Sequence, residues 1–123
     1  MISATDFLDA FRTSFVNKDT SSLDSLTSGD FTFSSTVEGT MWNKTETLEW
    51  VVSGDCQTID DFKIIHDGSD SIAGTHTASG TDWSARIFFF AKKTNNQVTE
   101  WHATAIPKQN NGKLNKSFVP QVV

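Results

Sequence analysis

The run Ile87-Phe88-Phe89-Phe90-Ala91 is the feature that most constrains the fold of this chain. It lies in a predicted hairpin whose last strand runs from Val98 to Ile106. A strand with one face in water alternates apolar and polar residues, whereas a strand covered on both faces can be apolar throughout. The sheet is therefore predicted to be covered on both sides. Helices on one face and a partner subunit on the other would supply that cover.

The bulk composition indicates one acidic domain with a true core. The 123 residues are enough to bury roughly two-thirds of the unfolded surface. The net charge of -5 argues against a nucleic-acid partner, because positive charge dominates such sites. One cysteine, Cys56, excludes an intrachain disulfide framework. The first residues show no basic segment or long apolar stretch, so we expect a cytoplasmic protein with no membrane partner.

The first half of the chain is predicted to be mainly helical. Apolar residues recur at helical spacing between Thr5 and Lys18, and a short second helix is expected up to Leu26. Residues 31–37 alternate as a first strand. Asn43 and Glu46 have the spacing of a capping box for a third helix, which is expected to end at Gly54.

From Thr58 onward the pattern predicts strands, near 59–66, 71–78, 83–93 and 98–106. Asn95-Asn96 suits a two-residue turn, because Asn tolerates a positive φ. Helices segregated from a strand meander indicate an α+β domain over residues 1–107, with 108–123 as a C-terminal extension. A strongly curved antiparallel sheet wrapped around the first helix would leave a cavity between them.

With these elements, the chain resembles the nuclear-transport-factor-2-like superfamily, and within it the SnoaL-like branch of polyketide cyclases. The resemblance covers residues 4–107 through the order of elements and two stretches, Gly74-Thr75-His76-Thr77 and Val98-Thr99-Glu100-Trp101-His102. It implies a cone-shaped fold of the cystatin-like roll type, a pocket inside the cone, and a homodimer formed through the outer face of the sheet.

The chain departs from the superfamily at its catalytic positions. Where the branch has His-Trp-Asp, this chain has Trp101-His102-Ala103, with the two rings exchanged and the carboxylate missing. Ketosteroid isomerase, a superfamily member, uses a Tyr and two acids. This chain has no Tyr, and the positions aligned with the acids are Ser35 and Phe88. A serine without a base partner cannot shuttle a proton at neutral pH, so that mechanism is not available.

Pairing across the predicted turns sorts the strand residues onto two faces. A two-residue turn at Asn95-Asn96 would pair Phe90 with Trp101 and Phe88 with Ala103, while a turn at Gly80-Thr81 would pair His76 with Ala85. One face would then carry Arg86, Phe88, Phe90 and Trp101. The other would carry His76, Glu100 and His102.

If the Arg86 face lines the cavity, the cone is a site for a small, largely apolar molecule. Arg86 would anchor a carboxylate or another anion, because its guanidinium is forked and permanently charged. Alternatively, Arg86 pairs with an acid at the rim and the aromatic residues are simply core. The resemblance implies that the Arg86 face is the one that lines the pocket. The full set of predicted binding residues is Arg86, Trp101, Phe88, Phe90, Ser35, Glu38 and Trp42.

If the other face lines the cavity, His76, Glu100 and His102 would form an acid–base unit. That unit would suit a cyclase, isomerase or dehydratase that abstracts a proton next to a carbonyl. The alternative is that these polar residues lie on the outer face, at the dimer interface. A third reading, a dimerisation or protein-docking module, gains if Phe and Trp side chains fill the cone.

No cofactor is predicted. His66, Asp67 and Asp70 cluster near a turn, but a metal site needs more ligands at better spacing. Cys56 has no basic neighbour in sequence to lower its pKa, so a nucleophilic role is not expected.

Overall fold

The structure is a computed structural model and describes residues 2–36, 39–106, 109–110 and 113–114. Three helices, α1 (Ala4–Asn17), α2 (Ser21–Leu26) and α3 (Lys44–Ser53), accompany a sheet of six strands. The strands are β1 (Thr27–Ser35), β2 (Thr40–Asn43), β3 (Thr58–Asp67), β4 (Ser71–Ser79), β5 (Ser84–Thr94) and β6 (Gln97–Ala105). Two short strands, β7 (Gln109–Asn110) and β8 (Lys113–Leu114), pair with each other.

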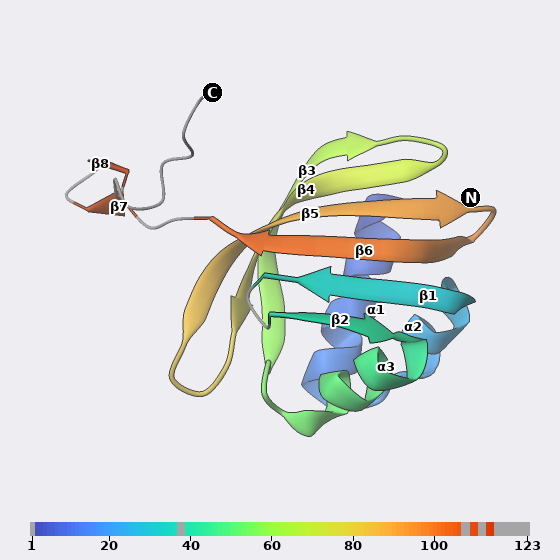
Figure 1. Cartoon of the computed structure of the whole chain (residues 1–123), viewed down its shortest axis with the longest axis horizontal. Coiled ribbons are helices and arrows are strands. Elements are labelled where there is room, and N and C mark those ends of the chain that lie inside the picture. The colour runs from blue at the N-terminus through green and yellow to red at the C-terminus, as the bar shows by residue number, and fades with distance from the viewer. Residues whose placement is uncertain (1, 37–38, 107–108, 111–112, 115–123) are drawn as a thin grey trace.

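The sheet has the order β2-β1-β6-β5-β4-β3 and bends around α1 (Figure 1). Strands β3 to β6 form the predicted antiparallel meander, and the predicted α+β class is confirmed. The sheet is mixed rather than antiparallel throughout, because β1 pairs parallel to β6. Strand β2 was not predicted; it pairs with β1 at the sheet edge. None of the described helices is long and apolar enough to cross a membrane.

The helix ends follow the local signals in the sequence. Ser3 caps α1 by accepting a hydrogen bond from the Asp6 N–H at 3.1 Å. At α3 both halves of the capping box between Asn43 and Glu46 are present, which confirms the prediction. Gly54 closes α3 with a φ of 88°, a conformation that favours glycine.

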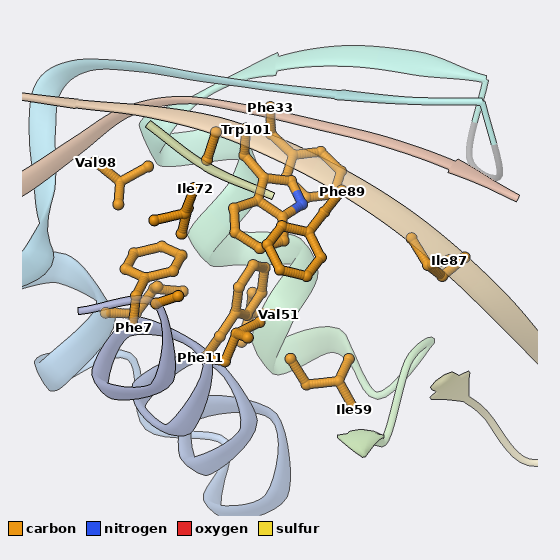
Figure 2. Close-up of a cluster of buried hydrophobic side chains, with 14 of the residues drawn as sticks. Phe7, Phe11, Phe33, Val51, Ile59, Ile72, Ile87, Phe89, Val98 and Trp101 are labelled. Carbon is orange, nitrogen blue, oxygen red and sulfur yellow. The ribbon is translucent and has the colours of Figure 1, made fainter. Parts of the chain in front are cut away.

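An aromatic core joins α1 to the concave, inner face of the sheet (Figure 2). The Trp101 ring stacks on Phe89 at 4.7 Å between ring centroids. Phe7 and Phe11 of α1 each lie 5.4 Å from Trp101. Aromatic pairs at these separations add stabilisation beyond the area they bury. Trp101 is therefore the centre of the contact between α1 and the sheet.

The predicted register between β5 and β6 is wrong by one residue. Trp101 lies opposite Ala91, not Phe90, and Ala103 lies opposite Phe89, not Phe88. The shift falls between Lys92 and Lys93, where β6 carries an extra residue, Thr99, as a β-bulge. One extra residue turns every following side chain to the other face. Trp101 therefore faces the helices, whereas Glu100 and His102 face away from them.

The register between β4 and β5 also differs from the prediction, but without consequence for the faces. His76 lies opposite Ile87, not Ala85, because four residues rather than two separate Ser79 from Ser84. A shift of two residues preserves the side-chain alternation of a strand. His76, Ile87 and Phe89 therefore share one face, as predicted, but that face is the inner one and not the outer one that the resemblance implied.

Candidate binding site in the cone

A small hollow lies inside the cone, between the inner face of the sheet and the helices. Its free volume is about 40 Å³. Six aromatic side chains dominate its lining: Phe11, Phe15, Phe33, Trp50, Trp83 and Trp101. Among the described lining residues, three carry a side-chain heteroatom outside these rings: Ser35, Cys56 and His76. The hollow is thus an apolar chamber with few polar groups.

His76 is the titratable group that stands out in this chamber. It is only 5% exposed, and the Phe89 and Trp101 rings lie 5.8 and 6.5 Å from its ring. Burial lowers the pKa of His76 to about 4, the Thr77 backbone opposes this shift, and the charge of Arg86 adds to it. His76 is therefore uncharged at neutral pH.

Nδ1 of His76 has no hydrogen-bond partner, the one such buried side-chain atom found among the described residues. Buried polar atoms are nearly always paired with protein groups or water, so an unpaired one calls for an explanation. Leaving such an atom unsatisfied costs about 1–3 kcal/mol. A bound molecule that pairs with Nδ1 would remove this cost.

Besides Trp101, two of the predicted binding residues lie in or beside the chamber. Ser35 at the end of β1 lines it and is buried. Trp42 of β2 stacks on Phe33 at 5.8 Å and lies 5.3 Å from Trp50, so it packs against two of the rings that line the chamber. Glu38 falls outside the described residues.

Arg86 lies on the outer face of the sheet, so the expectation that it anchors an anion inside the cone is wrong. Its Nη1 donates to the Asp61 carbonyl oxygen at 2.8 Å and to Thr77 Oγ1 at 3.1 Å. Its Nη2 donates to Thr75 Oγ1 at 2.7 Å. The guanidinium thereby ties β5 to β4 and β3. Phe88 and Phe90 share this outer face with Arg86, because they alternate with Ile87 and Phe89.

Glu100 and His102 also lie on the outer face, away from His76. The Oε1 atom of Glu100 is 3.0 Å from Nε2 of His102, and the His102 ring stacks near Phe90 at 6.3 Å. Of the predicted acid–base trio, only His76 lines the chamber. The three side chains therefore do not form one catalytic unit.

The outer face carries a broad shallow groove of about 720 Å³. Its lining includes the two predicted residues Phe88 and Phe90, together with Met41, His102 and Thr104. Phe88 is 36% exposed and Met41 73% exposed. This face thus presents apolar side chains that none of the described residues covers.

Sequence reasoning missed several lining residues, above all Trp50, Phe11 and Cys56. Trp50 lies two helical turns after the capped start of α3. Its large aromatic side chain was the available signal that it could line the chamber. Trp83 was missed as well, because the sequence grouped it with His76 on the face that was expected to be the outer one, whereas it lines the chamber from the turn before β5. No group of three or more His, Cys, Asp or Glu side chains in the described ranges is placed to hold a metal ion.

Comparison with solved structures identifies the fold. No protein-family model matches the sequence, and no curated protein does. The chain has the nuclear-transport-factor-2-like fold, as the sequence predicted, whereas membership of the SnoaL-like branch stays a prediction.

Three structures illustrate the match. A protein from Sphaerobacter thermophilus aligns with a TM-score of 0.71 and 11% identity, over 88% of this chain and 100% of its own. An NTF2-like protein of unknown function from Cytophaga hutchinsonii has a TM-score of 0.71 and 10% identity, over 87% of this chain and 93% of its own. A protein with a ketosteroid isomerase-like fold from Catenulispora acidiphila, solved with trimethylamine, has a TM-score of 0.61 and 12% identity, over 80% and 83%. At such identities the likeness shows the fold alone.

Proposed function

We propose that the cone binds a small, largely apolar, uncharged molecule that forms a hydrogen bond with Nδ1 of His76. The observation that carries this proposal is the unpaired, buried Nδ1 atom of His76, a residue that lines the aromatic chamber. Ligand sites are typically apolar hollows with a few placed polar groups that fix orientation. His76 would provide that polar group, and the six rings would provide the apolar contact area.

The lining favours an uncharged ligand over the anion considered from the sequence. Arg86 donates its hydrogen bonds on the outer face, and His76 is uncharged at neutral pH. Among the described residues, the chamber lining contains no carboxylate, lysine or arginine. An unpaired ion would lose its hydration on entry without a counter-charge, which is far more costly than burying a neutral polar group.

The free volume restricts the ligand to a few non-hydrogen atoms. At about 40 Å³ the hollow is well below the roughly 300–1,000 Å³ of sites for drug-sized molecules. The best tiny ligands gain about 1.5 kcal/mol per non-hydrogen atom, so a four-atom ligand would bind no tighter than roughly 40 µM. The Catenulispora protein was solved with trimethylamine, which also has four non-hydrogen atoms. Molecules of this size are therefore the first probes.

A panel of equal-sized probes tests the proposal. Acetone, 2-propanol and acetate each have a central carbon with three non-hydrogen substituents, but they differ in charge and hydrogen bonding. Titrations would follow the indole N–H signals of Trp50, Trp83 and Trp101 by NMR, because all three rings line the chamber. We expect 2-propanol to bind at least tenfold tighter than acetate, and His76→Phe to abolish its binding. The matched variant His66→Phe, at an exposed position, should leave it unchanged.

The acetone arm identifies the hydrogen-bonding role of His76. Acetone only accepts hydrogen bonds, whereas 2-propanol both donates and accepts, and the imidazole tautomer decides whether Nδ1 donates or accepts. Binding of both probes indicates a protonated Nδ1, and binding of 2-propanol alone indicates an accepting Nδ1. Equal binding of acetate and 2-propanol, or binding that survives His76→Phe, would contradict the proposal.

Proton-transfer catalysis has less support as a function. Glu100 and His102 pair with each other on the outer face, so they offer no base inside the chamber. His76 has a pKa of about 4, which makes it a weak base at neutral pH. Binding is therefore the better-supported reading.

We also propose that a second copy of the chain covers the outer face, as the family resemblance implies. The exposed Phe88 and Met41 side chains favour this occupant, because such apolar surface on a sheet face is typical of an interaction site. Phe88→Lys should convert a dimer into a monomer in analytical ultracentrifugation. A wild-type protein that sediments as a monomer at all concentrations would contradict this proposal.

A further inference from the structure

Two tryptophans form the rim of the chamber. Most lining residues are fully buried, and the partly exposed ones are Trp50, Trp83 and Ala103. Trp50 comes from α3, and Trp83 comes from the turn between β4 and β5. Apart from Ala103, these two indoles are the described lining groups that a molecule arriving from solvent can contact.

A single residue, Asp55, receives a hydrogen bond from each indole. The Trp50 Nε1–H donates to Oδ2 of Asp55 at 3.0 Å. The Trp83 Nε1–H donates to the main-chain oxygen of Asp55 at 3.2 Å. Asp55 lies in the connection between α3 and β3, so this connection links two rings that come from separate elements.

Close packing at Gly80 holds Trp83 in place. A Cβ atom at Gly80 would overlap Nε1 of Trp83 and lie only 2.6 Å from the Asp55 oxygen. The Gly80 N–H also donates to the Trp83 carbonyl oxygen at 3.0 Å. Only glycine fits between the indole and the Asp55 backbone, so the position of Trp83 depends on the absence of a side chain there.

The same turn is attached to the connection at a second point. The Gln57 N–H donates to the Ser79 oxygen at 2.8 Å, and Gln57 Nε2 donates to Thr81 Oγ1 at 3.0 Å. The turn therefore cannot move away from the connection as a whole without breaking these bonds. Admission of a larger molecule instead requires one or both indoles to leave Asp55.

We propose that Asp55 is a specificity-determining residue: it holds Trp50 and Trp83 across the mouth and thereby limits the size of the molecule that the chamber admits. This inference rests on the proposed binding function. Loss of one indole hydrogen bond should relax discrimination against larger ligands by about five- to tenfold, the effect of an ordinary net hydrogen bond.

The test compares 2-propanol with cyclohexanol, a larger secondary alcohol. In the wild type, cyclohexanol should bind more weakly than 2-propanol. Asp55→Ala should improve cyclohexanol binding relative to 2-propanol by about five- to tenfold. Asp55→Asn should retain the wild-type ratio, because its side-chain oxygen still accepts the Trp50 N–H. This pair of variants separates the hydrogen bond from the charge.

Two glycine variants provide an independent arm. Gly80→Ala should displace Trp83 and relax the size limit in the same direction as Asp55→Ala. Gly29→Ala is the matched control, because a Cβ atom there meets nothing within 4 Å. Exchange of the Trp50 indole N–H with solvent, followed by NMR without ligand, should accelerate in Asp55→Ala and stay unchanged in Asp55→Asn.

The outcomes separate this inference from the proposed function. If 2-propanol binds through His76 but Asp55→Ala leaves both the alcohol ratio and the Trp50 exchange rate unchanged, the role of Asp55 is refuted and the binding function stands. If 2-propanol fails to bind the wild type, the binding function and the size limit both fail. An unfolded Gly80→Ala protein leaves the Asp55 pair of variants to decide the question.

Discussion

The strongest single prediction concerns His76→Phe and the dependence of stability on pH. Burial lowers the pKa of His76 from 6.5 to about 4 in the folded protein. Between these two values the unfolded chain binds a proton that the folded protein does not. The contribution of His76 to stability is therefore fully present above pH 6.5 and is lost as the pH falls toward 4.

The magnitude follows from the same two values. One unit of pKa difference corresponds to about 1.4 kcal/mol, so the full loss at low pH is about 3 kcal/mol. At pH 5 the unfolded-state histidine is almost fully protonated and the folded one is almost fully neutral, which gives a loss of about 2 kcal/mol relative to pH 7.5. Phenylalanine does not titrate, so His76→Phe should lack this contribution.

The assay is urea unfolding at pH 7.5 and at pH 5, followed by tryptophan fluorescence. The buried Trp101 should make fluorescence sensitive to the loss of the core. We expect the wild type to lose about 2 kcal/mol more than His76→Phe between the two pH values. An equal loss in both proteins would refute the reasoning, because it would mean that His76 titrates alike in the folded and unfolded states.

Three further predictions concern stability, each measured by urea unfolding. Asn43→Ala removes the capping box of α3 and should cost about 1 kcal/mol, whereas an unchanged midpoint would show that the cap contributes nothing. Gly74→Ala places a Cβ atom against the Lys63 carbonyl oxygen and 3.0 Å from the Phe89 ring, so it should cost about 1–3 kcal/mol; a cost near zero would contradict this packing. Asp67→Ala removes the carboxylate that lies 3.3 Å from Nζ of Lys93. Because the Lys93 side chain is only 2% exposed, the loss of this partner should cost about 1–3 kcal/mol. Asp67→Ala in a protein that already carries Lys93→Met should cost clearly less, and equal costs would show that the Asp67–Lys93 ion pair contributes nothing to stability.

Local sequence signals predicted the ends of α3 and the turn at Asn95-Asn96 well. The capping box at Asn43 and the stop at Gly54 depend on residues within a few positions of each other, and both are present. The turn residue Asn95 has a φ of 59°, as a turn of this kind requires. Such features can be read from sequence because the interacting groups are close along the chain.

The sorting of residues onto the two sheet faces could not be predicted as well. The error began at Thr99, where the bulge has no strong local signal. The bulge allows Trp101 to pack against Phe89 and Phe11, and it leaves Glu100 and His102 on the outer face. Burying a tryptophan rather than a carboxylate is strongly favoured, but this preference acts between strands and helices far apart in sequence.

The position of Arg86 illustrates the same limit. The sequence correctly placed Arg86 on the same face as Phe88 and Phe90, but this face is the outer one. Its partner, the carbonyl oxygen of Asp61, belongs to an irregular part of β3 where Asp61 has a φ of 55°. Because every residue carries a main-chain carbonyl, the residue types do not indicate which of them will accept a hydrogen bond from Arg86.

The bulge in β6 has a consequence for how this chain can change length during evolution. Deletion of Thr99 would leave a regular ladder, with Val98 opposite Lys93 and Glu100 opposite Lys92 as before, and the chamber lining would be preserved. Deletion of His102 could also be absorbed by closing the bulge, but the residues between would then turn over, so that Glu100 faced inward and Trp101 outward. Two single-codon deletions only three positions apart would thus have opposite effects: loss of Thr99 would keep the chamber aromatic, whereas loss of His102 would place a carboxylate in it.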